Sequence, residues 1–99
     1  ALGSDLNPGT SWCESMPFIM ALAARYEKLS PAQAIVAATL NAAFACGVGA
    51  TVGSIEVNKQ ADLLIADTGD YRDLCYRFGA NPIATVIKRG RVYPPPSAL

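Results

Sequence analysis

The sequence predicts an α/β fold in which a helical first half precedes a β-rich second half. Apolar residues of the first half recur at helical spacing, whereas those of the second half form short runs separated by turn residues. The chain also opens on the apolar pair Ala1-Leu2, which leads into a polar turn as the end of a strand does. A strand end, helices and strands are therefore expected in that order.

The first helix is expected over residues 16–28. Ser15 stands where an N-cap is needed, and Pro17 falls in the first helical turn that follows it. The apolar residues of this segment share one helical face, namely Ile19, Leu22, Ala23 and Tyr26.

A second, alanine-rich helix is expected over residues 31–46. Ser30 and Gln33 have the spacing of a capping box, and Gly47 is typical of the residue that ends a helix. The many small side chains of this segment permit close packing against a neighbouring helix.

The second half is expected to form strands. Loose alternation predicts a strand over residues 52–57, a turn at 58–60 and a second strand at 63–66. Residues 71–78 have helical spacing over a short length, and residues 83–93 are typical of a terminal hairpin or a bent strand.

The length of the chain allows one domain, and its composition is unusually apolar for that size. Of its 99 residues 52% are hydrophobic and only 16% are charged, which is more apolar than a domain of this size normally needs. We therefore expect self-association or a homo-oligomer formed through exposed apolar faces. The apolar start and the proline-rich residues 94–99 also suggest a piece of a larger enzyme that ends in a tail.

Charge and cysteine content limit the classes of binding partner and the cellular compartment that are expected. Eight basic and eight acidic residues are interspersed, which disfavours binding to nucleic acid or to an anionic membrane and favours a small-molecule substrate. The chain has no apolar run long enough to span a bilayer and no signal-peptide pattern. Three widely spaced cysteines indicate reduced thiols rather than a disulfide framework, so a cytoplasmic protein is expected.

Asp5 is the first candidate for chemistry. A carboxylate at the end of a strand, before a loop with proline and glycine, lies where α/β barrels assemble catalytic groups. It could ligate a metal or transfer a proton, but the chain contains no histidine to complete a metal site. The alternative is that the Asp5 side chain simply caps the turn.

Asn7, Gly9 and Thr10 form the second candidate group. They offer an amide, an approachable main-chain N–H and a hydroxyl within four residues, which suits them to hold a carboxylate or another polar part of a small molecule. The same residues also make an ordinary turn.

Two sets of motifs resemble a known superfamily. Residues 53–65 read Gly-Ser-Ile-Glu-Val-Asn-Lys-Gln-Ala-Asp-Leu-Leu-Ile and resemble the segment that ends many metal-dependent amidohydrolases. Residues 4–10, 15–17, 39–43 and 76–82 resemble the imidazolonepropionase family within that superfamily. The resemblance extends from residue 1 to about residue 93.

The resemblance implies an architecture. The chain would be the C-terminal fragment of a (β/α)8 barrel amidohydrolase. Residues 1–50 would supply the last barrel strand and its helices, residues 51–93 the C-terminal part of a small β-sandwich, and residues 94–99 a tail.

The resemblance also implies a site. Asp5 would be both a catalytic residue and a ligand of one zinc or iron ion, whose other ligands are histidines that this chain lacks. Asn7, Gly9 and Thr10 would bind the substrate. The implied reaction of the full-length enzyme is hydrolysis of the cyclic amide of 4-imidazolone-5-propanoate to N-formimidoyl-L-glutamate, and the fragment alone is expected to be inactive.

Two alternatives stay open. Another cyclic amidohydrolase, similar to dihydroorotase or hydantoinase, would keep Asp5 without needing Asn7, Gly9 and Thr10 for a propanoate arm. A small non-catalytic interaction module would explain the missing histidines directly.

Overall fold

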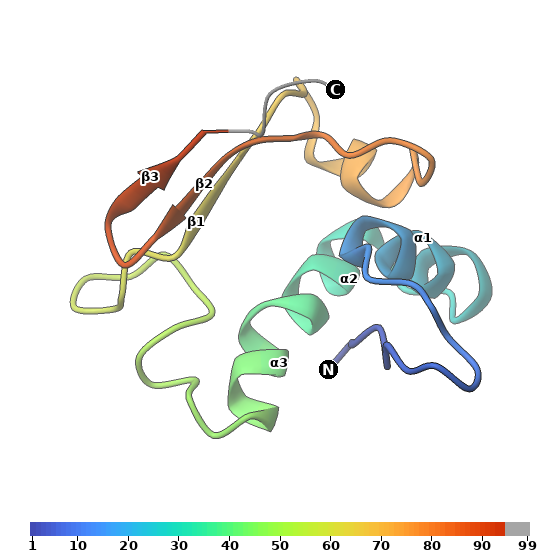
Figure 1. The fold of residues 1–99 in the computed structure, drawn as a ribbon, viewed down its shortest axis with the longest axis horizontal. Coiled ribbons are helices and arrows are strands. Elements are labelled where there is room, and N and C mark those ends of the chain that lie inside the picture. Colours follow the sequence, from blue (N-terminus) through green and yellow to red (C-terminus); the bar gives the residue numbers. More distant parts are fainter. Residues whose placement is uncertain (95–99) are drawn as a thin grey trace.

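The computed structural model describes residues 1–94 and confirms the expected α/β class. The helices gather on one side and the three-stranded sheet lies on the other, connected by the long loop between α3 and β1 (Figure 1). In chain order the elements are α1 (Met16–Tyr26), α2 (Pro31–Ala38), α3 (Leu40–Ala45), β1 (Leu63–Ala66), the 3-10 helix η1 (Tyr71–Cys75), β2 (Ile83–Lys88) and β3 (Arg91–Tyr93).

Helix α1 begins at its expected cap. The Ser15 hydroxyl accepts a hydrogen bond from the Phe18 N–H at 3.3 Å, which satisfies one of the main-chain donors that a helix start leaves unpaired. The helix ends at Tyr26, slightly earlier than expected, because Lys28 adopts a left-handed conformation with φ of +59°.

Helix α2 begins with the expected capping box. The Ser30 hydroxyl accepts from the Gln33 N–H at 3.2 Å, and the Ser30 N–H donates to Gln33 Oε1 at 2.9 Å. The prediction of one continuous helix over residues 31–46 is wrong at Thr39, where φ is −118° and ψ is −86°. The Thr39 hydroxyl donates to the carbonyl of Ile35 at 2.7 Å, the acceptor that the Thr39 N–H uses in a regular helix.

Helix α3 stops at the predicted glycine. Gly47 has φ of +78°, its N–H donates to the Phe44 carbonyl at 3.0 Å, and the Val48 N–H donates to the Ala43 carbonyl at 2.9 Å. These two bonds form a Schellman motif, which needs a residue with positive φ at this position.

A small core joins α1, α2 and η1. Met20, Ala34 and Cys75 are buried together, so the short helical segment expected after residue 71 packs across the two longer helices. The buried side chains are mostly alanine, and no large side chain is fully enclosed in the described residues.

The expected strand at 63–66 and the expected hairpin at 83–93 are both confirmed. Strand β2 pairs antiparallel with β1 on one edge and with β3 on the other. Arg89 and Gly90 connect β2 to β3 with φ of +51° and +77°. A two-residue loop with both φ values positive is a type I′ turn, whose twist matches that of the paired strands.

Both faces of the sheet are apolar. Cross-strand pairing places Leu63, Ile87 and Val92 on one face, and Leu64, Val86 and Tyr93 on the other. Within residues 1–94, no Cα atom of a strand lies within 8 Å of a Cα atom of a helix. The helices therefore leave both faces uncovered.

The predicted strand at residues 52–57 is wrong. This segment consists mostly of bends and irregular backbone, and Ile55 and Val57 are 87% and 91% exposed, because no strand among residues 1–94 pairs with it. Ala1-Leu2 pairs with no strand among these residues, and the Leu2 N–H donates to the Ala37 carbonyl of α2 at 2.8 Å. A barrel strand would need neighbouring strands on both sides.

The predicted tail falls almost wholly on residues 95–99, outside the described residues. Among the helices of residues 1–94, none has the length and apolar character needed to cross a membrane.

Candidate functional site

The candidate site is the loop of residues 4–12, which is cross-linked by its own hydrogen bonds. The Asn7 N–H donates to the Ser11 carbonyl at 2.7 Å, and the Ser11 hydroxyl donates to the Ser4 carbonyl at 3.2 Å. The Trp12 indole N–H donates to the Pro8 carbonyl at 2.9 Å. All of these bonds join residues close in sequence, so the loop shape depends little on the rest of the fold.

Asp5 lies exposed at the start of this loop. Its backbone has φ of +49°, a left-handed conformation that aspartate tolerates better than most residues. Within residues 1–94 its carboxylate takes part in no hydrogen bond or ion pair. In this loop the residue that caps the turn with its side chain is Asn7 rather than Asp5.

The Asn7 carboxamide is the centre of the loop. Its Oδ1 accepts from the N–H of Gly9 at 2.9 Å and from the N–H of Thr10 at 2.8 Å. Its Nδ2 donates to the Asp5 carbonyl at 2.6 Å and to Thr10 Oγ1 at 3.1 Å. The structure thus brings the four residues singled out in the sequence into one hydrogen-bonded group.

Gly9 is tightly fitted in this group. A Cβ atom at position 9 would lie 3.3 Å from Asn7 Oδ1, closer than an ordinary contact. The Gly9 and Thr10 N–H groups are both committed to Asn7, and the exposed Thr10 hydroxyl also bonds with the Asn7 carboxamide. The polar group of the loop most available to a ligand is therefore the Asp5 carboxylate.

Asp5 is the only His, Cys, Asp or Glu residue of this loop. In the part of the chain that the structure describes, no three His, Cys, Asp or Glu side chains converge. A catalytic zinc or iron site needs several protein ligands around one open position. An exposed carboxylate without internal hydrogen bonds fits the role of one hard oxygen ligand in a set completed by other residues.

Three further residues shape the loop without having been singled out from the sequence. Ser4 and Ser11 close the loop, and the signal for this was the turn-forming Asn-Pro-Gly-Thr run between them. Trp12 is 83% exposed and contributes its indole N–H to the loop.

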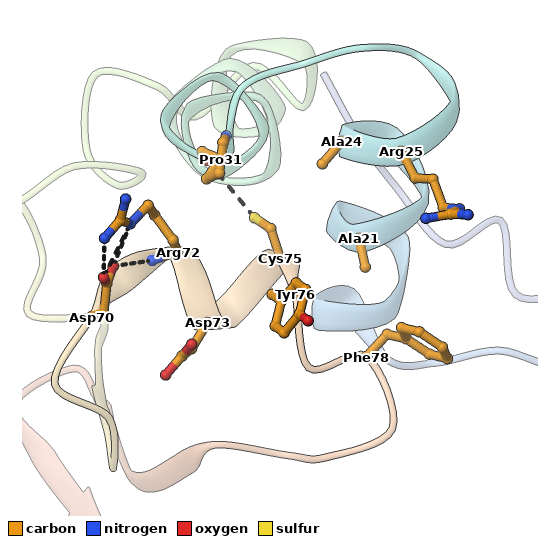
Figure 2. Close-up of a pocket in the computed structure, with 10 residues that line it drawn as sticks. All are labelled: Ala21, Ala24, Arg25, Pro31, Asp70, Arg72, Asp73, Cys75, Tyr76 and Phe78. Atoms are coloured by element: carbon orange, nitrogen blue, oxygen red, sulfur yellow. Dashed lines mark hydrogen bonds and ion pairs between the residues drawn. The ribbon is translucent and has the colours of Figure 1, made fainter.

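A groove lies elsewhere, between α1, the start of α2 and η1 (Figure 2). Its volume is about 530 Å³, and Asp5, Asn7, Gly9 and Thr10 do not line it. Its lining residues are Ala21, Ala24, Arg25, Pro31, Asp70, Arg72, Asp73, Cys75, Tyr76 and Phe78.

Two groups of this groove, the Asp70 carboxylate and the Cys75 thiol, are already engaged. Asp70 accepts two bonds from Arg72 Nε at 3.0 Å each, and this guanidinium lowers the pKa of Asp70 to about 2. The Cys75 thiol points to the Pro31 carbonyl at 3.8 Å (Figure 2), and burial raises its pKa. A buried thiol with a raised pKa is a poor nucleophile.

Comparison with known proteins connects the loop to a family. The model of the amidohydrolase family matches residues 1–93. The chain is 54% identical to the imidazolonepropionase of Herpetosiphon aurantiacus, over 93% of this chain and 22% of that protein. It is 49% identical to the imidazolonepropionase of Chloroflexus aggregans, over 93% of this chain and 22% of that one.

A third relative, the imidazolonepropionase of Rubrobacter xylanophilus, is 42% identical over 96% of this chain and 23% of its own length. The chain therefore spans about a fifth of the length of the curated relatives that it matches. The family match covers the candidate loop, the helices and the sheet alike, and on this ground the chain belongs to the amidohydrolase family.

Proposed function

We propose that this chain is the C-terminal part of a hydrolase that opens the ring of 4-imidazolone-5-propanoate to give N-formimidoyl-L-glutamate, a step of histidine degradation. The observation that carries the proposal is the 42–54% identity to relatives named imidazolonepropionase, which extends over at least 93% of the chain. The hydrogen-bonded loop around Asn7 supports it, because that loop gathers the residues proposed for the site.

The proposal also covers how the chain fits into the fold of a longer polypeptide. Residues 1–50 would complete a (β/α)8 barrel with strands from the longer polypeptide, and residues 51–93 would complete a small β-sandwich. The two uncovered apolar faces of the sheet support this, since strands buried on both sides are apolar on both faces. The last barrel strand would then form at residues 1–4 only when its neighbours are present.

In this proposal Asp5 has two tasks. Its carboxylate holds a zinc or iron ion together with ligands from the longer polypeptide, and it takes the proton from the attacking water and passes it to the leaving ring nitrogen. The ion, when bound, polarises the amide carbonyl and lowers the pKa of water toward ~7. The exposed carboxylate without internal partners is suited to both tasks.

Asn7, Gly9 and Thr10 form the substrate-binding part of the loop. The exposed Thr10 hydroxyl and the exposed Gly9 main chain face a molecule bound beside Asp5, and Gly9 leaves room for a close approach. A small-molecule substrate and a cytoplasmic location complete the proposal, and the three free cysteines agree with a reducing compartment.

The test uses the full-length protein, expressed from the complete reading frame that contains these residues and loaded with zinc or iron. We expect it to hydrolyse 4-imidazolone-5-propanoate and to leave hydantoin and dihydroorotate essentially unchanged. Preferential turnover of either of those two substrates would replace the proposal with another cyclic amidohydrolase. A reading frame that encodes these residues alone would favour the non-catalytic module.

A further inference from the structure

We propose that Lys59 is a clamp, whose ammonium holds the connector between α3 and β1 closed and so fastens the β2–β3 turn to the end of α3. The connector is residues 46–62, which follow α3 and precede β1. The inference goes beyond the proposed function and does not rest on it, because it concerns how the helical half and the strand half of the chain are held together.

The sheet needs such a fastening because it does not pack on the helices. Within residues 1–94, no Cα atom of a strand lies within 8 Å of a Cα atom of a helix. Among these residues the sheet is therefore joined to the helices through the connector and through the segment that contains η1 (Figure 1). The η1 segment is anchored by the buried Cys75, but the connector contains no helix or strand. Its shape depends on hydrogen bonds between its own residues.

Lys59 supplies the central bonds of the connector. Its Nζ donates to the Gly49 carbonyl at 2.9 Å and to Ser54 Oγ at 2.7 Å, and it pairs with Glu56 Oε2 at 3.0 Å. An ammonium carries three protons, so these three acceptors match its donors. The side chain is only 12% exposed, and a charge removed from water is stable only where polar partners surround it. The closed connector provides these partners.

The partners of Lys59 also bond to each other. The Ser54 hydroxyl donates to the Glu56 carboxylate, while its oxygen accepts from Lys59. Each of the three side chains thus bonds to the other two, and the bond to the Gly49 carbonyl attaches this closed network to the main chain after α3. Because the bonds share partners, removal of one member weakens the others as well.

Contacts continue from the clamp to both halves of the chain. Gly49 follows the turn that ends α3, so its bond to Lys59 brings the far end of the connector back to that helix. Two residues after Lys59, the Ala61 carbonyl accepts from the Gly90 N–H of the β2–β3 turn at 3.0 Å. The clamp therefore lies on a path of contacts that leads from α3 to the tip of the hairpin.

The experiment measures amide hydrogen exchange in the full-length protein that contains these residues. Two amides report on the clamp, namely Gln60, whose N–H donates to the Thr51 carbonyl at 2.8 Å, and Gly90. Lys59→Met keeps the apolar stem and removes the ammonium, so both amides should exchange on the order of 10-fold faster. Lys28→Met, at an exposed lysine after α1, is the matched control and should change neither rate.

A milder variant keeps the test decisive if Lys59→Met does not fold. Ser54→Ala removes one acceptor and keeps the lysine, so both amides should exchange a few-fold faster than in the wild type. Where Lys59→Met does fold, the two effects should not add in the double variant, because Ser54 acts through its bond to Lys59.

Unchanged exchange of both amides in Lys59→Met, or in Ser54→Ala if only that variant folds, would overturn the inference. Acceleration at Gln60 with wild-type exchange at Gly90 would overturn it too, because the lysine would then close the connector without holding the turn of the sheet. Hydrogen exchange needs no substrate, so none of these outcomes depends on which reaction the full-length protein catalyses.

Discussion

Asp62 connects the loop before β1 to the turn between β2 and β3. Its carboxylate accepts from Lys88 Nζ at 2.7 Å and from the Arg89 N–H at 3.0 Å, and these bonds lower its pKa from 3.8 to about 2. Because the pKa is lowered on folding, the carboxylate stabilises the hairpin at pH above roughly 4, and this contribution is lost as the pH falls through about 2.

We predict that Lys88→Met raises the pKa of Asp62 part of the way back toward 3.8, since Lys88 is the largest cause of the shift and the Arg89 N–H remains. A 13C-NMR titration of the Asp62 carboxyl carbon measures this. Arg91→Met, which changes the residue opposite Lys88 on β3, is the control and should leave the midpoint in place. An unshifted midpoint in Lys88→Met would show that the ion pair does not form in solution.

Substitutions at the two positions of the turn between β2 and β3 should change the stability of the hairpin in opposite directions. Arg89 occupies a φ of +51° that asparagine adopts more easily, so Arg89→Asn should stabilise the hairpin. Gly90 has φ of +77°, and Gly90→Ala should destabilise it by about 1 kcal/mol. Amide exchange of β2 measures both, and the prediction fails if the two variants shift protection in the same direction.

The loop after α3 depends on Gly53. Its φ is +100°, and a Cβ atom there would lie 2.7 Å from Ala43 Cβ and 3.1 Å from Leu40 Cα. Gly53→Ala should therefore destabilise the packing of this loop on α3 by about 1–3 kcal/mol. Chemical denaturation measures the free energy of unfolding of this variant. The control is Gly79→Ala, because a Cβ atom at position 79 would meet open space. Equal stability of the two variants would contradict the contact.

Local signals predicted the helix ends well. The Ser15 cap, the Ser30 capping box and the Gly47 stop each depend on residues within a few positions of one another, so the sequence contains all the information they need. The break at Thr39 was missed because either the N–H or the hydroxyl of Thr39 can donate to the Ile35 carbonyl. Residue spacing does not show which of the two donors is used.

Strands were predicted less well, for a physical reason. Alternation at residues 52–57 resembles that of a strand, but strand formation requires a partner, and none pairs with this segment among residues 1–94. The turn at residues 5–10 was predictable from turn chemistry, whereas the role of Asp5, Asn7, Gly9 and Thr10 as site residues stays a prediction that rests on family resemblance. The central position of Asn7 in the loop could not be predicted, because it depends on which of several possible hydrogen bonds the Asn7 carboxamide makes.

The whole molecule exposes more surface than a compact protein of its mass. Its accessible area is 7362 Å² at 10.4 kDa. The scaling for folded monomers gives only about 5400 Å², so roughly 2000 Å² remains in excess. That excess is comparable to a protein–protein interface of standard size, and it agrees with a chain that packs against further polypeptide.

We predict that the isolated 99-residue chain self-associates through its sheet. Leu64 and Val86 are 63% and 41% exposed and lie opposite each other on one apolar face. Leu64→Lys should shift sedimentation-velocity profiles toward monomer, whereas Ala50→Lys, in the exposed loop after α3, should not. A wild-type chain that sediments as a monomer at ~100 μM would contradict the prediction, since weak apolar interfaces form in the micromolar range.

In the proposed function Asp5 holds the catalytic ion of a longer enzyme, and the hydrolysis rate of the Asp5→Asn variant tests this role. In the metal-loaded full-length protein, we expect the rate on imidazolonepropionate to fall at least about 100-fold, because the loss of a ligand and proton acceptor costs several kcal/mol. Asp67→Asn, at another exposed aspartate, should keep the wild-type rate. A wild-type rate in Asp5→Asn would contradict the account.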